Sequence, residues 1–167
     1  MTQRPSLQAA EAADGQRDFD FIFGDWTVHN RRRINPLAGL DEWVEFEGTS
    51  TARPIWGGAA NLEEYHAVAP TGPIDGLTLR VYNPSSRQWS LLWANRTRGA
   101  FDKPMVGEFR NGRGEFYDQE DFNGRAIFVR YVWSGISPAS CRWEQAFSTD
   151  GGKTWEPNWV MQFARKQ

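Results

Sequence analysis

The sequence predicts an all-β protein, built of about ten antiparallel strands that close into an up-and-down barrel. Short runs of alternating apolar and polar residues recur from residue 24 to the end of the chain, as expected for strands with one buried face. Tight turn sequences separate these runs, and no long helical period interrupts them. Nine Trp, eleven Phe and four Tyr enrich the 167-residue chain in side chains that favour strands.

Ten segments have the length and alternation of strands, and turn sequences connect them. Asn111-Gly112 and Asn123-Gly124 are typical of two-residue hairpins with positive φ at both positions, which require antiparallel neighbours. The segments 83–86 and 150–152 are further turns. The expected strands are 24–33, 41–52, 60–68, 76–83, 87–95, 104–110, 113–121, 125–134, 140–148 and 157–166.

Residues 18–23, which Gly24 ends, are the candidate for a short N-terminal helical turn that plugs one end of the barrel. A flat sheet of so many strands would leave two exposed edges, and closure removes them. A two-sheet sandwich is the alternative architecture, although the regular succession of hairpins favours the barrel.

We expect a single domain over residues 18–167, with residues 1–17 disordered or loosely attached. These first residues lack the apolar core of a signal peptide, and no run in the chain has the length of a membrane-spanning helix. The expectation is therefore a cytoplasmic protein without membrane insertion. A net charge of −2, with acids and bases interspersed, gives no footprint for nucleic acid.

The sequence offers few residues for a metal site or for covalent catalysis. His29 and His66 are the only histidines and Cys141 the only cysteine, so no ligand spacing resembles a zinc or iron site. Cys141 is expected to be a buried, inert thiol. Arg80 and Arg130 lie mid-strand, where each could anchor an anionic ligand or cover an outer aromatic ring.

Alternation assigns an inward face to several strands because successive side chains point to opposite sides. Two strands are ambiguous: neither face of 60–68 is clean, and 125–134 is apolar on both faces apart from Arg130. A shift of one residue there would reverse every side chain. The inward sets are Val44, Phe46 and Gly48; Trp89, Leu91 and Trp93; Trp143, Gln145 and Phe147; and Trp159, Met161, Phe163 and Arg165.

The start of the first strand resembles the opening of calycin barrels, the lipocalin and fatty-acid-binding class. Gly24 and Trp26 form its Gly-x-Trp motif, directly after the aromatic turn. The resemblance implies that Trp26 closes one end of the barrel and that a basic residue from a late strand packs over it. Arg165, on the inward face of the last strand, matches that residue. A guanidinium there would stack on the indole and donate to backbone carbonyls.

From about residue 18 the chain also resembles a bacterial family of unknown function that opens with F-D-F-x-x-G-x-W. Further motifs of that family match residues 80–84, the pair Trp89 and Trp93, and residues 142–144 and 148–155. The resemblance covers most of the chain. It implies a calycin-like barrel and transfers no established activity.

Residues 148–155 fit the Asp-box pattern S-x-D-x-G-x-T-W, which is familiar from β-propeller sialidases. Asp150 is expected to accept hydrogen bonds from amides of its own turn, with Trp155 packed beneath. A propeller needs one copy per blade, and this chain has a single copy. The motif therefore predicts a hairpin and is silent about chemistry.

The leading functional hypothesis is a carrier or sensor that binds a small apolar or aromatic molecule in the barrel lumen. A mostly apolar cavity with few polar contacts is typical of such sites. The expected apolar lining residues are Phe46, Leu79, Trp93, Tyr131, Trp143 and Met161, and the expected polar ones are Glu64, His66, Asn95 and Gln145.

Three other hypotheses stay open. An isomerase or hydrolase could use Glu64 and His66, which share a strand face, but both could equally face solvent while Tyr65 faces inward. His66 could instead hold haem, whereas His29, opposite Trp26, is expected to face outward; otherwise we expect no cofactor. A barrel filled by its own side chains would serve only as an interaction module.

A homodimer is also expected. The strands near 89–93, 127–133 and 159–163 carry apolar residues on both faces. A contiguous apolar surface on the outside of a barrel usually marks a partner interface. The aromatic segment 19–23 is the alternative cover for that surface.

Overall fold

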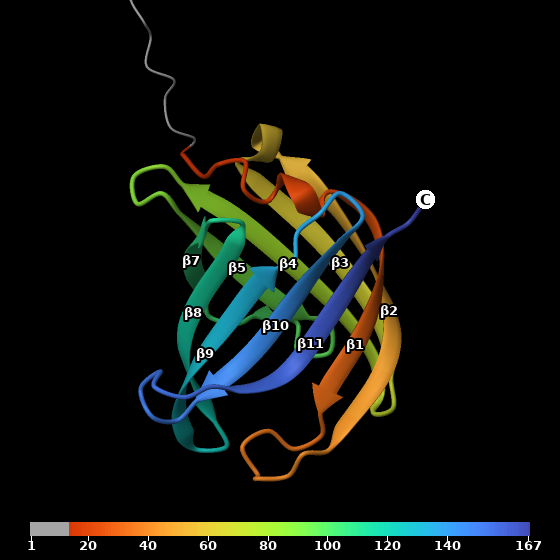
Figure 1. Cartoon of the computed structure of the whole chain (residues 1–167), viewed down its shortest axis with the longest axis vertical. Coiled ribbons are helices and arrows are strands. Elements are labelled where there is room, and N and C mark those ends of the chain that lie inside the picture. Colours follow the sequence, from red (N-terminus) through yellow and green to blue (C-terminus); the bar gives the residue numbers. More distant parts are fainter. Residues whose placement is uncertain (1–13) are drawn as a thin grey trace, which may run out of the picture.

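The structure, a computed structural model, describes residues 14–167. Ten strands close into an antiparallel barrel in the order β1-β2-β3-β4-β5-β7-β8-β9-β10-β11, with β11 paired to β1 (Figure 1). This closure confirms the expected barrel and is incompatible with the sandwich. The strands are β1 (Gly24–Arg33), β2 (Trp43–Ile55), β3 (Ala60–Ala69), β4 (Gly72–Asn83), β5 (Gln88–Asn95), β6 (Ala100–Phe101), β7 (Met105–Arg110), β8 (Arg113–Phe122), β9 (Arg125–Ser134), β10 (Ser140–Ser148) and β11 (Glu156–Arg165).

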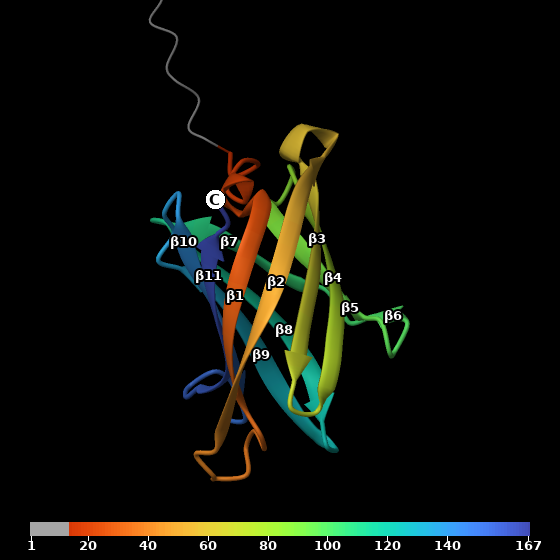
Figure 2. The same cartoon turned by 90° about the vertical axis from the view of Figure 1, so that its right-hand side faces the viewer.

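The tight turns explain why neighbours in sequence are neighbours in the barrel. Asn111 and Gly112 have φ of 52° and 74°, and Asn123 and Gly124 have φ of 52° and 78°. These values suit two-residue hairpins whose twist matches that of the flanking strands. The sequence did not predict β6, a short strand that pairs with the end of β5 in a loop standing out from the barrel wall (Figure 2).

The two ambiguous strands have a definite phase in the structure. On β3, Glu63 and Tyr65 are buried while Glu64 and His66 are exposed. On β9, Tyr131 lines the interior cavity described below. The residues directly before and after Tyr131 therefore point outward, because successive side chains of a strand point to opposite faces. The assigned inward faces of the other strands agree with the observed burial, including Phe46 and Trp89 at 7% and 1% exposure.

A plug closes one end of the barrel. The short helix η1 (Asp20–Ile22) inserts Ile22, and Phe19 just before it is equally buried. Trp26 donates from Nε1 to the carbonyl oxygen of Ile22 at 2.8 Å. A second short helix, η2 (Trp56–Gly58), connects β2 and β3 and leaves Trp56 exposed.

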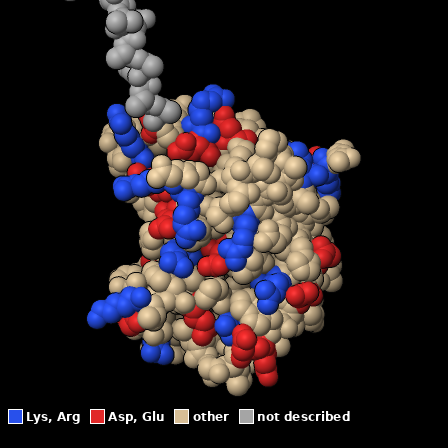
Figure 3. All heavy atoms as spheres, viewed as in Figure 1, with Lys and Arg blue, Asp and Glu red and all other residues tan. Residues whose placement is uncertain are grey.

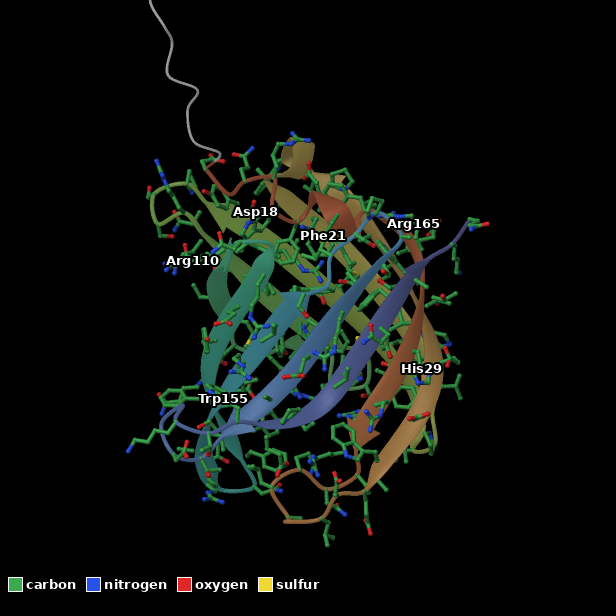
Figure 4. All side chains as sticks on the ribbon, viewed as in Figure 1. Asp18, Phe21, His29, Arg110, Trp155 and Arg165 are labelled. Carbon is green, nitrogen blue, oxygen red and sulfur yellow. The ribbon has the colours of Figure 1, made fainter. Side chains whose placement is uncertain are left out.

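Arg165 stacks on Trp26, with its guanidinium carbon 4.1 Å from the ring centre. It donates to the carbonyl oxygens of Phe21 at 2.9 Å, Phe23 at 2.5 Å and Pro138 at 2.7 Å. Figure 4 shows Phe21 and Arg165 together at this end of the barrel and Trp155 toward the other. The stacking implied by the calycin resemblance is therefore present.

Residues before 18 also contact the barrel. Trp89 donates from Nε1 to the carbonyl oxygen of Gly15 at 3.0 Å, and the Tyr82 hydroxyl donates to that of Asp14. Contacts between the N-terminal segment and the barrel are thus present from residue 14 on. The expectation that residues 1–13 are disordered or loosely attached lies outside the described residues. No helix within 14–167 has the length and apolar character needed to cross a membrane. The face in Figure 3 shows acidic and basic side chains intermixed.

Candidate ligand-binding site

The barrel encloses a cavity of about 390 Å³ between the plug and the opposite end. Its walls come from most strands of the barrel because inward side chains alternate along each of them. The exposed residues Arg32 and Arg98 lie at its rim, so the cavity reaches solvent at the end away from the plug. The aromatic lining residues are Tyr65, Trp93, Phe122, Tyr131, Trp133, Trp143, Phe147, Trp159 and Phe163.

Trp159 on β11 is the centre of the aromatic wall. Its ring centre lies 5.7 Å from that of Trp143 and 6.5 Å from that of Trp93, nearly perpendicular to both. Its Nε1 donates to Asn30 Oδ1 at 3.0 Å, and the Tyr65 hydroxyl donates to the same oxygen at 2.7 Å. Edge-to-face geometry and these hydrogen bonds hold the wall in one arrangement.

Trp93 takes its position from a glycine on the neighbouring strand. A Cβ atom on Gly76 of β4 would lie 1.8 Å from a carbon of the Trp93 ring. The indole therefore rests against the bare backbone of β4, where any larger residue would displace it. Trp93 and Trp143 do not pack against each other as a pair, and both line the cavity.

A buried ion pair forms the cavity floor next to the plug. Arg80 on β4 is 2% exposed and pairs through Nη2 with Glu63 on β3, which is 5% exposed. Its Nη1 donates to Asn61 Oδ1 at 2.9 Å, and the Ser50 hydroxyl donates to Glu63 Oε1 at 2.7 Å. The Arg80 guanidinium lies 4.9 Å from the ring centre of Phe19, which belongs to the plug. Hydrogen bonds of this kind are what make a buried charge pair tolerable.

Acidic groups gather at the mouth. Glu120 on β8 and Asp102 in the β6–β7 loop line the cavity, and Asp102 pairs with Arg98 at 2.6 Å. Burial raises the pKa of Glu120, and the nearby Asp118 and Asp102 raise it further. Burial also raises the pKa of Tyr131, as do the negative charges of these three carboxylates. The mouth thus favours a protonated Glu120 more than open solvent would.

Six of the ten expected ligand-binding residues line the cavity, namely Trp93, Asn95, Tyr131, Trp143, Gln145 and Met161. Phe46 is buried in the core but does not reach the cavity. Leu79 faces outward because its neighbours Thr78 and Arg80 occupy the inward positions of β4.

The expected placement of Glu64 and His66 in the lumen is wrong. His66 lies on the outer face, where its Nδ1 is 2.6 Å from Asp75 Oδ1 and its side chain is 57% exposed. Glu64 lies on the same outer face. The phase of β3 therefore removes both the proposed acid–base pair and the proposed haem ligand from the cavity. His29 faces outward as expected and contacts Glu47 at 2.5 Å.

Cys141 is a buried thiol at 2% exposure, as expected. Burial raises the pKa of this thiol to about 12, and Glu63 contributes to the rise. A thiol with such a pKa is almost entirely protonated near neutral pH and makes a poor nucleophile.

The Asp-box forms the turn between β10 and β11. Asp150 Oδ1 accepts from the amides of Lys153 at 3.1 Å and Thr154 at 2.9 Å, and Oδ2 accepts from the Thr154 hydroxyl at 2.5 Å. Trp155 donates from Nε1 to Gly152 and lies beneath the Arg130 guanidinium at 4.5 Å. Arg130 thus covers an outer aromatic ring, whereas Arg80 lies inside the barrel.

Sequence reasoning missed several residues that shape the site, among them Glu63, Tyr65 and Trp159. Trp159 was assigned to the inward face but not to the binding set. Glu63 and Tyr65 depend on the phase of β3, which the sequence leaves open. A signal was available in the alternation of Thr78, Arg80 and Tyr82 on β4, since an inward Arg80 requires an inward acid nearby.

Neither a protein-family model nor a curated protein matches the chain. Among solved structures it is similar to the S-type phycobiliprotein lyase from Guillardia theta, with a TM-score of 0.60 and 12% identity, over 91% of this chain and 92% of that chain. It is also similar to a redesigned β-barrel bound to DFHBI, with a TM-score of 0.48 and 12% identity, over 87% of this chain and 99% of that one. The likeness to the lyase supports the antiparallel β-barrel fold.

Proposed function

We propose that this barrel binds a small, largely aromatic molecule in its lumen, as a carrier or sensor. The observation that carries the proposal is the aromatic-walled cavity of about 390 Å³, which reaches solvent opposite the plug. This volume falls within the range of small-molecule sites, roughly 300–1,000 Å³. The same cavity argues against a barrel filled by its own side chains.

The chemistry of the walls supports a flat, apolar ligand. Trp93, Trp143 and Trp159 present wide, rigid surfaces that lose little conformational entropy on binding. The charged groups that line the cavity lie at its floor and at its mouth, so they can orient the two ends of a ligand while its middle contacts uncharged side chains. One fold neighbour is a phycobiliprotein lyase, which is a reason to include bilins among the compounds tested.

Tryptophan fluorescence tests the proposal. Titration with flavonoids, fatty acids, bilins and haem is expected to change the emission for at least one class. Trp93→Leu should weaken that binding by roughly 1–3 kcal/mol, the scale for losing part of a buried aromatic contact. The substitution should leave the barrel folded because Trp26, not Trp93, closes its end.

Trp56→Leu is the matched control. Trp56 is 75% exposed on η2, near the plug and outside the cavity. Its loss should leave the affinity of every compound unchanged. The proposal fails if no compound class changes the emission, or if Trp93→Leu and Trp56→Leu affect binding equally.

A further inference from the structure

The cavity floor holds two buried donor groups that no described residue serves. Within residues 14–167, Arg80 Nε and Trp133 Nε1 are both buried and have no hydrogen-bond partner. Each residue is 2% exposed, and both line the cavity. A buried N–H without an acceptor costs free energy, so a pair of them at a cavity wall calls for an explanation.

The neighbouring acceptor side chains bond to other donors and do not serve these two. Glu63 uses one oxygen for Arg80 Nη2 and the other for the Ser50 hydroxyl. The Asn61 oxygen accepts from Arg80 Nη1. The guanidinium also packs against two rings that contact each other, 4.9 Å from the centre of Phe19 and 5.6 Å from that of Trp133. Arg80 is therefore fixed with Nε left over.

We propose that the floor is a subsite for an uncharged acceptor oxygen of the ligand, such as the carbonyl of an aryl ketone. This rests on the proposed lumen binding and adds the orientation of the ligand, with its oxygen entering first. The oxygen would accept from Arg80 Nε or Trp133 Nε1, which are donors of neighbouring side chains. An acceptor there removes the cost of an unsatisfied buried donor.

The charge of the floor favours a neutral oxygen over a carboxylate. Glu63 already balances Arg80, and both side chains are almost fully buried. A second anion would have to lose its hydration beside Glu63 without a cation of its own. The remaining cations that line the cavity, Arg32 and Arg98, are exposed at its rim.

Three matched probes test the subsite by calorimetry: 2-ethylnaphthalene, 2-acetylnaphthalene and 2-naphthoate. They share one ring system and differ in carrying no acceptor, a neutral acceptor and an anionic one. The ketone should bind about 10-fold more tightly than the hydrocarbon, the scale of one recovered buried hydrogen bond. It should also bind more tightly than the carboxylate.

Two variants locate the effect. Trp133→Phe removes one donor and should lower the preference for ketone over hydrocarbon several-fold. Arg80→Lys keeps a cation beside Glu63 but removes Nε–H, and should act in the same direction. Phe163→Leu is the control, because Phe163 lines the cavity 5.3 Å from Trp133 without a donor. It should weaken both probes alike and leave the preference unchanged, and thermal melts would verify that each variant folds.

The outcomes separate the subsite from the lumen. If ketone and hydrocarbon bind equally and Trp93→Leu weakens both, lumen binding stands and the acceptor subsite is wrong, with water serving the two donors. If the carboxylate binds most tightly, the neutral assignment is wrong. If none of the three probes binds although another aromatic compound changes the tryptophan emission, lumen binding stands and the acceptor subsite is contradicted.

Discussion

Asp150 shows how one carboxylate can fix a turn. It accepts hydrogen bonds from two amides and two hydroxyls of its own loop. The Thr154 hydroxyl and amide and the Ser148 hydroxyl lower the pKa of Asp150 to about 2. These donors stabilise the charged form, and they exist only in the folded loop.

Asp150→Ala should therefore lower the melting temperature at neutral pH and leave ligand affinity unchanged. Because the folded pKa of about 2 lies below the ordinary value of 3.8, the stabilisation is fully present above pH 4 and is lost as the pH falls toward 2. Melting curves of wild type and variant should thus converge in acid. Identical melting of the two proteins at pH 7 would contradict the Asp-box interpretation.

The pKa of Glu120 is shifted in the opposite direction to that of Asp150. Its pKa is raised, first by burial and then by Asp118 and Asp102, so the folded state favours the protonated acid. The associated stability is present below the unfolded pKa, near 4.5, and is lost as the pH rises through the folded pKa. Glu120→Gln, which mimics the protonated form, should raise the melting temperature by a few degrees at pH 7.5 and have little effect at pH 4. A uniform effect at both pH values would argue against this origin.

Adjacent residues on β3 show where sequence reasoning stops at this scale. Glu63 is buried beside Arg80, whereas Glu64 is exposed. Local alternation cannot distinguish them because both faces of 60–68 carry acidic and apolar groups. Contacts with other strands decide which of the two residues is buried. Glu63 pairs with Arg80 on β4, and the Tyr65 hydroxyl donates to Asn30 on β1. Such long-range partners are invisible in a window of nine residues.

At the scale of elements, η1 and the end of β11 depend on each other through Arg165. Its three hydrogen bonds join Phe21 and Phe23 of the plug to Pro138 in the β9–β10 loop. Gly24 has a φ of 110°, and a Cβ atom there would lie 2.7 Å from Arg165 Nη1. The glycine of the Gly-x-Trp motif thus makes room for the guanidinium.

Arg165→Met should lower the free energy of unfolding by about 2 kcal/mol or more, since three carbonyl groups lose a charged donor. Arg165→Lys should fall between wild type and Arg165→Met, because lysine keeps the charge but not the planar fork. Urea denaturation measures both. Lumen affinity of the folded protein should not change, as the cavity lining does not include Arg165. Equal unfolding midpoints for wild type and Arg165→Met would contradict this role.

Strands flanked by clear turn residues were predictable from the sequence, and a strand too short to show alternation was not. β1, β9 and β10 have the expected bounds because turn residues or Gly flank them. β6 was missed because its two residues, Ala100 and Phe101, offer no alternation to detect. That loop nevertheless matters, since its neighbours Arg98 and Asp102 form part of the cavity mouth.

At the scale of the whole molecule, the sequence was enough to predict that the barrel closes, but not that its interior holds a cavity. Antiparallel hairpins in succession leave closure as the way to remove sheet edges. Whether inward side chains fill the interior depends on their packing in three dimensions. Here the indoles of Trp93, Trp143 and Trp159 stand around a space rather than across it. Local alternation cannot reveal that difference.

The outer surface bears on the expected homodimer. Two outward residues of the strands on which that expectation was based, Val132 and Val160, are buried within the chain at 2% and 9% exposure. Outward apolar side chains remain exposed on β7, β8 and β9, at Val106, Tyr117 and Phe128. Val106 and Tyr117 are paired across β7 and β8. We call these three residues the β7–β9 patch.

We expect the protein to form a homodimer through the β7–β9 patch, since exposed apolar side chains on neighbouring strands of a barrel wall favour burial against a partner. Light scattering at micromolar concentration should give the mass of a dimer for the wild type. Val106→Arg places a charge in the patch and should shift the mass toward the monomer. Val68→Arg is the matched control, because Val68 is 66% exposed on β3, away from the patch. A monomeric wild type, or dissociation by Val68→Arg as readily as by Val106→Arg, would contradict the assignment.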